Sequence, residues 1–230
     1  DVLDAVGIES DACQVLFQGA DSGEPAPNKP MMSYLRSLPM DVAMHQGTLI
    51  AYEMNGEELP THHGYPLRLV VPGWYGMASV KWLIGIKVID YDYQGFFQTE
   101  KYVIKNSDGI PEQITQMSVK SLISDPAERA LLPKEPTCVS GMAWSGYTGI
   151  EKVEFSADGG RNWDQTNLSP PSGPYAWQQW HIKWVPLQLG HYTLLSKATD
   201  ESGHVQPMET LWNSGGYIVN GVRPICVTVG

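Results

Sequence analysis

The sequence predicts two parts of different fold class. Residues 1–105 are predicted to form a mixed α+β portion, residues 106–136 a connector, and residues 137–230 an all-β, immunoglobulin-like sandwich. A length of 230 residues suits two ordinary domains. The composition, 42% hydrophobic with 23 Gly and 17 Pro, is that of a folded, loop-rich protein. The patterning changes after the polar, proline-containing connector, beyond which turn-bounded strands recur.

The first part mixes helical and strand signals. The chain starts at Asp1 without a charged or apolar leader, and its first residues predict the end of a helix closed by Gly7, so we expect the chain to begin inside a domain. Residues 31–38 predict a short helix that Pro39 would end. The Asn55-Gly56 pair predicts a tight turn. Strands are predicted over residues 12–20, 48–54, 68–71 and 80–89.

The second part is predicted to be all-β. Asp158-Gly159-Gly160 lies between two apolar runs and predicts a hairpin turn. Turn-bounded strands at this spacing are typical of an immunoglobulin-type sandwich. Because the sequence has no Cys, Trp, Cys arrangement of the antibody kind, an antibody-like domain is not expected. The predicted strands cover residues 150–155, 177–184, 191–198 and 225–229.

Charge, hydropathy and cysteine content argue against several classes of protein. A net charge of −10 argues against a nucleic-acid partner, since phosphate binding favours a basic face. No apolar run approaches the roughly 18 residues of a membrane-spanning helix. Cys13, Cys138 and Cys226 are far apart and form no C-x-x-C pair, so no zinc-ribbon site is predicted. We expect these cysteines to be small buried residues.

The strongest functional signal lies between His62 and Trp82. This run sets two histidines, Arg68 and Lys81 around a short apolar strand and a glycine-rich loop. Backbone N–H groups of such a loop, together with cationic side chains, are the donors that an anionic ligand requires. The run therefore predicts a site for an anion.

The motifs of this run resemble the molybdopterin-binding signature of the sulfite oxidase family. They are His63-Gly64-Tyr65-Pro66-Leu67-Arg68, then Val70-Val71-Pro72-Gly73, then Ser79-Val80-Lys81-Trp82, preceded by Ala51-Tyr52-Glu53-Met54-Asn55-Gly56. Later motifs resemble the C-terminal dimerisation domain of the family, among them Ala143-Trp144-Ser145-Gly146, Gln206-Pro207 and Trp212-Asn213. The resemblance covers nearly the whole chain.

The resemblance implies roles for particular residues. Those that match the family's contacts to the pyranopterin and its phosphate are Asp21, His63, Arg68, Ser79, Val80 and Lys81. Tyr102 falls at the family's active-site tyrosine. Arg223 lies about one position away from the family's substrate-binding arginine. His62 is expected to be a surface or packing residue, and no metal ligand is predicted in this chain.

The resemblance also implies an activity. It is that of a molybdenum-cofactor oxidoreductase, which oxidises sulfite or a similar small oxyanion by oxygen-atom transfer. Electrons would pass to a separate acceptor such as a cytochrome, the enzyme would be a homodimer, and its location would be the periplasm. The family binds molybdenum through a cysteine upstream of the first residue of this chain, and no cysteine here has that context. We therefore expect this chain alone to be inactive.

Two other classes of function fit parts of the sequence. The chain could be a non-catalytic fragment or degenerate paralogue that dimerises through its second part. It could also be a carbohydrate-binding sandwich with exposed tryptophans, which accounts for the 8 Trp but not for the run from His63 to Lys81.

Overall fold

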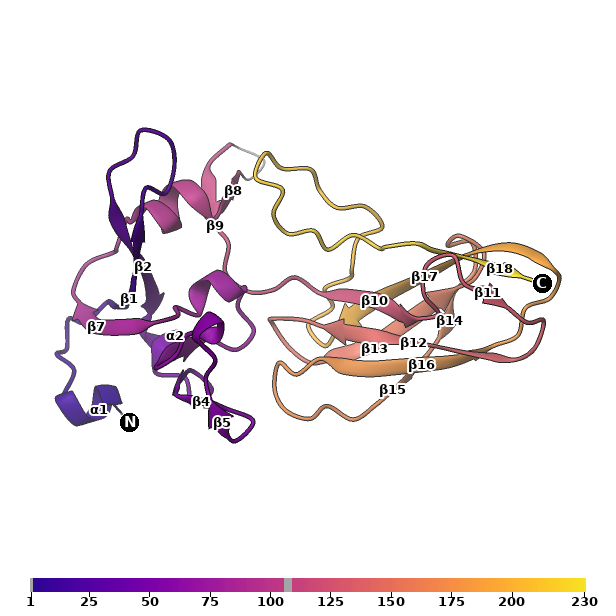
Figure 1. Ribbon diagram of the computed structural model, residues 1–230, viewed down its shortest axis with the longest axis horizontal. Coiled ribbons are helices and arrows are strands. Elements are labelled where there is room, and N and C mark those ends of the chain that lie inside the picture. Colours follow the sequence, from indigo (N-terminus) through magenta and orange to yellow (C-terminus); the bar gives the residue numbers. More distant parts are fainter. Residues whose placement is uncertain (1, 106–108) are drawn as a thin grey trace. The chain divides into compact units, whose positions relative to one another are not determined.

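A computed structural model describes residues 2–105 and 109–230, and it divides the chain into two compact units, Asp1–Thr115 and Gln116–Gly230 (Figure 1). Strands dominate both units, and the longest helical segments of the described part have 5 residues. Helix content in the first unit is thus lower than the predicted mixed α+β class suggests. None of the described helices has the length and apolar character needed to cross a membrane.

A three-stranded antiparallel sheet organises the first unit. Its order is β2 (Met32–Pro39), β1 (Gln14–Gly23) and β7 (Leu83–Ile89). The prediction of a helix over residues 31–38 is wrong, since this segment is β2 and pairs with β1. Tyr34, Arg36 and Leu38 occupy every second position of β2, so their side chains lie on the same face of the strand.

Short elements complete the first unit. α1 (Val2–Val6) buries Leu3 against the sheet, and Gly7 follows it with the left-handed φ of 78° expected of a helix-ending glycine. Asn55 and Gly56 have φ values of 56° and 81° and form the predicted turn between β4 and β5. The other short elements are α2 (Met40–Ala43), β3 (Leu49–Ala51), β4 (Glu53–Met54), β5 (Glu57–Glu58), η1 (Thr61–His63), β6 (Arg68–Val70), η2 (Gly76–Ala78), η3 (Phe97–Lys101), β8 (Val103–Lys105) and β9 (Pro111–Gln113).

The predicted connector over residues 106–136 differs most from the structure. Its residues 106–108 lie outside the described part of the chain. The remainder contains β9, β10 (Lys120–Asp125) and β11 (Leu131–Leu132), and the second unit begins at Gln116. β10 and β11 are full members of the sheets of the second unit.

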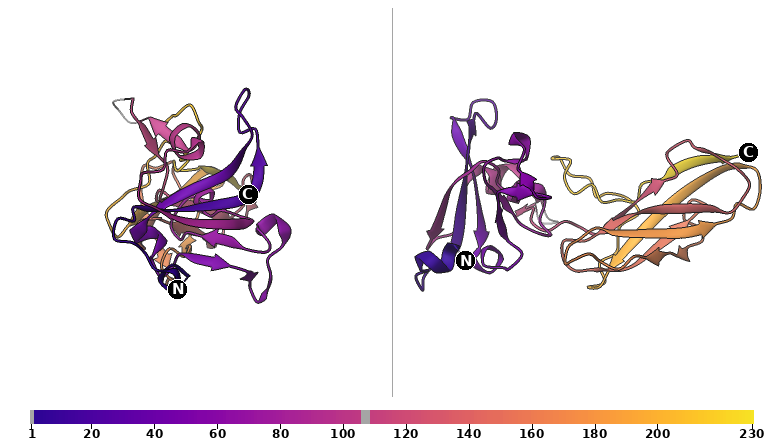
Figure 2. Two further views of the ribbon diagram at one scale, coloured as in Figure 1. Left: turned by 90° about the vertical axis from the view of Figure 1, so that its left-hand side faces the viewer. Right: turned by 60° about the horizontal axis from the view of Figure 1, so that its bottom comes forward.

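Two sheets enclose the core of the second unit (Figure 2). One has the order β10-β12-β16-β15 and the other β11-β18-β17-β13-β14. Val139 and Trp180 of the first sheet belong to the same buried cluster as Val153 and Leu194 of the second. The bounds are β12 (Thr137–Trp144), β13 (Ile150–Ser156), β14 (Asp164–Gln165), β15 (Asn167–Leu168), β16 (Gln178–Trp184), β17 (Gly190–Asp200) and β18 (Ile225–Val229).

The expectation of buried cysteines is wrong. Cys13, Cys138 and Cys226 are free thiols, and all three are exposed. Strand alternation explains two of them, because Cys138 precedes buried Val139 on β12 and Cys226 lies between buried Ile225 and Val227 on β18.

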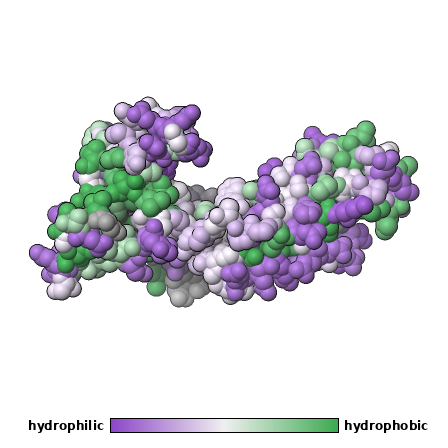
Figure 3. All heavy atoms as spheres, turned by 90° about the horizontal axis from the view of Figure 1, so that it is seen from below, coloured by the Kyte–Doolittle hydropathy of each residue, from purple (hydrophilic) through white to green (hydrophobic). Residues whose placement is uncertain are grey.

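Leucines are exposed at the end of the second unit where β17 begins and β18 ends. Leu131, Leu187 and Leu189 have exposed fractions of 75%, 87% and 62%. The first residue of β17, Gly190, pairs with Val229, and β11 pairs with β18 at the same end. Figure 3 shows a hydrophobic area (green) at this end.

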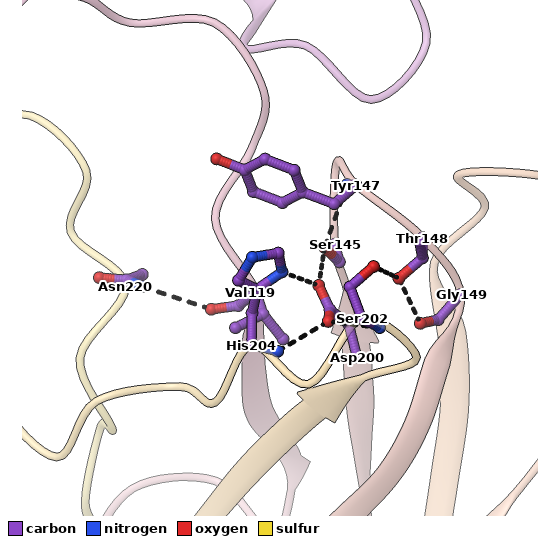
Figure 4. A network of polar contacts seen from close by, with 9 residues as sticks. All are labelled: Val119, Ser145, Tyr147, Thr148, Gly149, Asp200, Ser202, His204 and Asn220. Atoms are coloured by element: carbon purple, nitrogen blue, oxygen red, sulfur yellow. Dashed lines mark hydrogen bonds and ion pairs between the residues drawn. The ribbon is translucent and has the colours of Figure 1, made fainter.

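A buried carboxylate fixes the turn after β17 (Figure 4). Asp200 is 0% exposed and accepts hydrogen bonds from Ser145 Oγ at 2.8 Å, from the Ser202 amide at 3.0 Å and from the His204 amide at 2.9 Å. His204 Nδ1 lies 3.0 Å from its Oδ2. Burial acts to raise the pKa of Asp200, but the hydrogen bonds from Ser145 and His204 outweigh it and hold the pKa below its ordinary value.

Candidate functional site

Lys81 and Arg68 converge on the turn η1. Lys81 Nζ donates to the His62 carbonyl at 3.0 Å, and Arg68 Nη1 donates to the His63 carbonyl at 3.1 Å. Trp82 Nε1 donates to the Thr61 carbonyl at 2.9 Å, and Lys81 Nζ lies 4.5 Å from the centroid of the Trp82 ring. Three carbonyls of one turn therefore hold two cations and an indole in place.

Gly64 brings the two cationic side chains together. Its φ is 110°, in the left-handed region that favours glycine. A Cβ at this position would lie 3.0 Å from Arg68 Cβ and 3.1 Å from Lys81 Cβ. Any larger residue would push the stems of Arg68 and Lys81 apart. This steric requirement explains why the motif has a glycine at position 64.

Ser79 and Val80 hold the loop against β6. Ser79 Oγ accepts a hydrogen bond from the Val71 amide at 3.1 Å. The Val80 side chain is buried, and its carbonyl accepts from the Leu69 amide at 2.8 Å. The described contacts of these two residues are thus with the protein, and their predicted contact with a cofactor stays a prediction.

Asp21 lies beside the backbone of the same loop. It is exposed and follows Gly19 on β1. A Cβ on Gly19 would meet Asp21 Oδ1 and would lie 3.0 Å from the Lys81 carbonyl oxygen. The Ala20 amide donates to the Trp82 carbonyl at 2.8 Å. Strand β1 therefore places the Asp21 carboxylate close to the backbone of the segment that carries Lys81 and Trp82.

The two histidines differ in exposure. His62 is exposed, as expected of a surface residue, and His63 is half-buried. Their rings lie 4.3 Å apart between centroids. The carbonyl groups of both residues hold Lys81 and Arg68, a contribution that their side-chain chemistry does not predict.

A second cluster surrounds Tyr102, which ends the π-helix η3. Tyr102 is half-buried, its ring centroid lies 6.4 Å from that of Phe97, and the Cζ of Arg36 lies 5.9 Å from its ring. Gln98 Oε1 accepts from the Ser37 amide at 2.6 Å and so joins the π-helix to β2. Short π-helices are frequent at functional sites.

Arg36 is the buried cation of this cluster. It is 0% exposed, and its Nη1 donates to the Phe97 carbonyl. Its Nε and Nη2 have no hydrogen-bond partner among residues 2–105 and 109–230. Burial lowers the pKa of Arg36, and the neighbouring Tyr34 acts to raise it. The sequence did not point to Arg36, because its pattern predicts a helix over residues 31–38. In the strand that forms instead, Arg36 lies on the same face as Tyr34 and Leu38, and this face is largely buried.

Tyr34 connects the two clusters. Its hydroxyl donates to the Met77 carbonyl of η2 at 2.7 Å, next to the loop that carries Ser79. Burial raises the pKa of Tyr34 well above its usual range, with smaller contributions from Tyr102 and Asp21 in the same direction. Asp21 and Tyr102 therefore share one electrostatic environment around Tyr34.

Arg223 belongs to the second unit. It is exposed and lies just before β18. Burial lowers the pKa of Lys120, and the positive charge of Arg223 lowers it further, so these two cations are neighbours.

The arrangement in the first unit fits an anionic cofactor with a hydrogen-bonding ring system. Arg68 and Lys81 lie side by side with N–H donors beyond those that the described contacts use, and both cations suit a phosphate. The Asp21 carboxylate can accept from ring N–H groups. The glycine cradle at Gly64 keeps the cations close without a side chain between them.

Comparisons with known proteins identify the family of both units. Residues 1–97 match the family model described as oxidoreductase molybdopterin binding domain, and residues 111–228 match that described as Mo-co oxidoreductase dimerisation domain. Mitochondrial sulfite oxidase of Mus musculus is 34% identical over the whole chain and 45% of its own length. Nitrate reductase [NADH] 2 of Phaseolus vulgaris is 28% identical over 91% of the chain and 26% of its own length.

A solved structure agrees with these matches. The sulfane dehydrogenase SoxCD of Paracoccus pantotrophus is 32% identical with a TM-score of 0.83, over 97% of this chain and 57% of that one. The chain thus spans about half the length of the animal sulfite oxidases it matches. On both family models and on these relatives, the chain belongs to the sulfite oxidase family of molybdopterin-dependent oxidoreductases.

Proposed function

We propose that this chain holds the molybdenum cofactor and forms the dimer of an enzyme that oxidises sulfite, or a similar small sulfur oxyanion, by oxygen-atom transfer. The observation that supports it most is the pair Arg68 and Lys81, which the turn η1 and Gly64 set side by side. When bound, the cofactor supplies the redox chemistry.

The residues of the first unit bind and orient the cofactor in this proposal. Arg68 and Lys81 neutralise its phosphate, and Asp21 accepts from the pterin amino group. His63 borders the same site, and Ser79 and Val80 keep the loop on β6. Tyr102 is assigned to the substrate side through its hydroxyl, and Arg223 to binding of the oxyanion, both on the family resemblance.

The remaining assignments concern the whole protein. We infer a homodimer formed through the second unit, which is of immunoglobulin-like type, and electron transfer to a separate acceptor such as a cytochrome. We also propose that the enzyme is located in the periplasm. The family model described as a dimerisation domain supports the homodimer.

A second candidate substrate deserves a test in the same assay. The match to the sulfane dehydrogenase at a TM-score of 0.83 supports oxidation of sulfane sulfur. A non-catalytic, dimerising role is the other alternative, and it predicts no oxidation of either substrate.

Purification of the protein in its full natural length tests these proposals. Molybdenum and pterin content is measured first, and reduction of ferricyanide or cytochrome c is then followed with sulfite and with thiosulfate. We expect stoichiometric cofactor and sulfite-dependent reduction. Protein that binds pterin but oxidises neither compound would support the non-catalytic role, and protein that contains no pterin would overturn the proposal.

A further inference from the structure

Arg36 carries a charge that the described part of the chain leaves unmatched. Its side chain is 0% exposed. Burial lowers its pKa, and the groups that act to raise the pKa are Tyr34, Tyr102 and Tyr93 rather than a carboxylate. A buried guanidinium without an anionic partner is costly, because water is excluded and no opposite charge replaces it. Such a group indicates that an anion belongs next to it.

The unsatisfied atoms lie on one edge of the guanidinium. Nη1 is occupied by the Phe97 carbonyl, whereas Nε and Nη2 have no acceptor among the described residues. In the planar guanidinium these two N–H groups point the same way, and together they form the fork that binds two oxygens of one anion. A lone water would satisfy this edge only in part, and an oxyanion would satisfy both donors and the charge.

The neighbours of this edge leave it to an external ligand. The Phe97 carbonyl already accepts from Nη1, and both the oxygen and the nitrogen of the Gln98 side-chain amide form hydrogen bonds with Ser37. Tyr34 donates its hydroxyl to Met77. Both nitrogens are sealed from solvent, so binding of an anion requires a neighbouring side chain to move. The Tyr102 ring, whose centroid lies 5.9 Å from Arg36 Cζ, is half-buried.

We propose that the Nε and Nη2 edge of Arg36 binds one small oxyanion beside Tyr102. The identity of that anion as substrate rests on the proposed function, which makes it a sulfur oxyanion. The same chemistry would suit the phosphate of the cofactor, and the two sources separate experimentally, since loss of a phosphate contact reduces cofactor content and loss of a substrate contact raises KM.

The first test is a titration that needs no turnover. The protein in its full natural length is labelled with ¹⁵Nε-arginine, and the Arg36 signal is identified by its loss in Arg36→Lys. We expect sulfate to shift this signal saturably and to leave that of Arg161, an exposed arginine of the second unit, unchanged. An Arg36 signal that sulfate leaves as unchanged as the Arg161 signal throughout the titration would overturn the inference.

The second test separates the sources of the anion. In Arg36→Met we expect wild-type pterin content and a KM for sulfite that is higher by about 10- to 100-fold, as loss of a bidentate charge-assisted contact implies. Arg161→Lys is the control and should leave KM unchanged. Loss of pterin from Arg36→Met would reassign the edge to the cofactor and overturn the substrate assignment. If Arg36→Met does not fold, the wild-type titration still decides. A wild-type enzyme that oxidises no sulfite but shows the sulfate shift would refute the proposed function alone.

Discussion

Arg36 Nη1 donates to the carbonyl of Phe97, so a residue of β2 holds the first residue of the π-helix that leads to Tyr102. Gln98 adds a second connection, to the Ser37 amide at 2.6 Å. The edge strand of the sheet and the π-helix therefore behave as one rigid support. Since Tyr34 on the same strand also donates to the Met77 carbonyl, one strand positions both Tyr102 and the loop before Ser79.

Arg68 and Lys81 are expected to determine cofactor retention. Replacement of either by alanine removes a charge-assisted contact of about 1.5–3 kcal/mol, so pterin content of the purified protein should fall markedly and its apparent affinity by about 10- to 150-fold. Lys87→Ala is the matched control, because Lys87 is exposed on β7. Wild-type molybdopterin content in both variants would contradict the assignment of these cations.

Gly64 is expected to tolerate no side chain. Gly64→Ala combines a left-handed φ of 110° with Cβ contacts of 3.0 and 3.1 Å to Arg68 and Lys81. We expect a loss of roughly 1–3 kcal/mol in the free energy of unfolding, measured in urea, together with reduced pterin content. Gly56→Ala is the control for strain alone, since its φ is 81° and no atom lies within 4 Å of the added Cβ. Equal losses in the two variants would show that crowding at Gly64 is unimportant.

Local chemistry made part of this fold predictable from the sequence. Asn55-Gly56 forms its turn because these residues accept positive φ, here 56° and 81°, without help from the rest of the chain. The run that carries Arg68, Lys81 and a glycine-rich loop predicts an anion site. The structure places the stems of both residues next to Gly64, and binding of an anion there stays a prediction.

Tertiary contacts decided what the sequence did not show. The segment of β2 has an arginine and a serine where a strand would bury apolar residues, and both are accommodated by partners about 60 positions away, Phe97 and Gln98. β10 was hidden in a polar stretch, because buried Ser121 is satisfied by Ser196 and Gln206 of the same unit. Such long-range pairings leave no periodic signal in the sequence.

Tyr102 is expected to act through its hydroxyl group. Tyr102→Phe keeps the ring that faces Arg36 and Phe97, so cofactor content should be unchanged. We expect kcat with sulfite to fall by roughly 100-fold, because the proposed role of the hydroxyl is proton transfer or charge stabilisation. Tyr91→Phe, at an exposed tyrosine, is the control. A wild-type kcat in Tyr102→Phe would place this tyrosine outside the chemistry.

Asp200 is expected to make stability depend on acid. Its pKa is lower in the folded protein than its ordinary value of 3.8, so it stabilises the fold above about pH 4, and this stability is lost as pH falls through the folded pKa. Asp200→Asn should lower the free energy of unfolding at pH 7 by about 1–3 kcal/mol, because the amide cannot satisfy all four contacts. It should also flatten the decline in stability between pH 5 and pH 3, whereas Asp125→Asn, at an exposed aspartate, should not. A parallel decline in wild type and Asp200→Asn would contradict this role.

The exposed leucines of the second unit are expected to lie in the homodimer interface. Leu187 and Leu189 are 87% and 62% exposed and lie at the same end of the second unit as Leu131, and large apolar side chains gathered in water are typical of an association surface. We expect light scattering at micromolar concentration to give the mass of a dimer for wild type and of a monomer for the double variant Leu187→Glu, Leu189→Glu, because each glutamate would lose its hydration on association. Leu211→Glu is the matched control, since Leu211 is 85% exposed in a different segment of the same unit. A double variant that stays dimeric while Leu211→Glu dissociates would move the interface to the segment around Trp212, and a monomeric wild type would contradict dimerisation altogether.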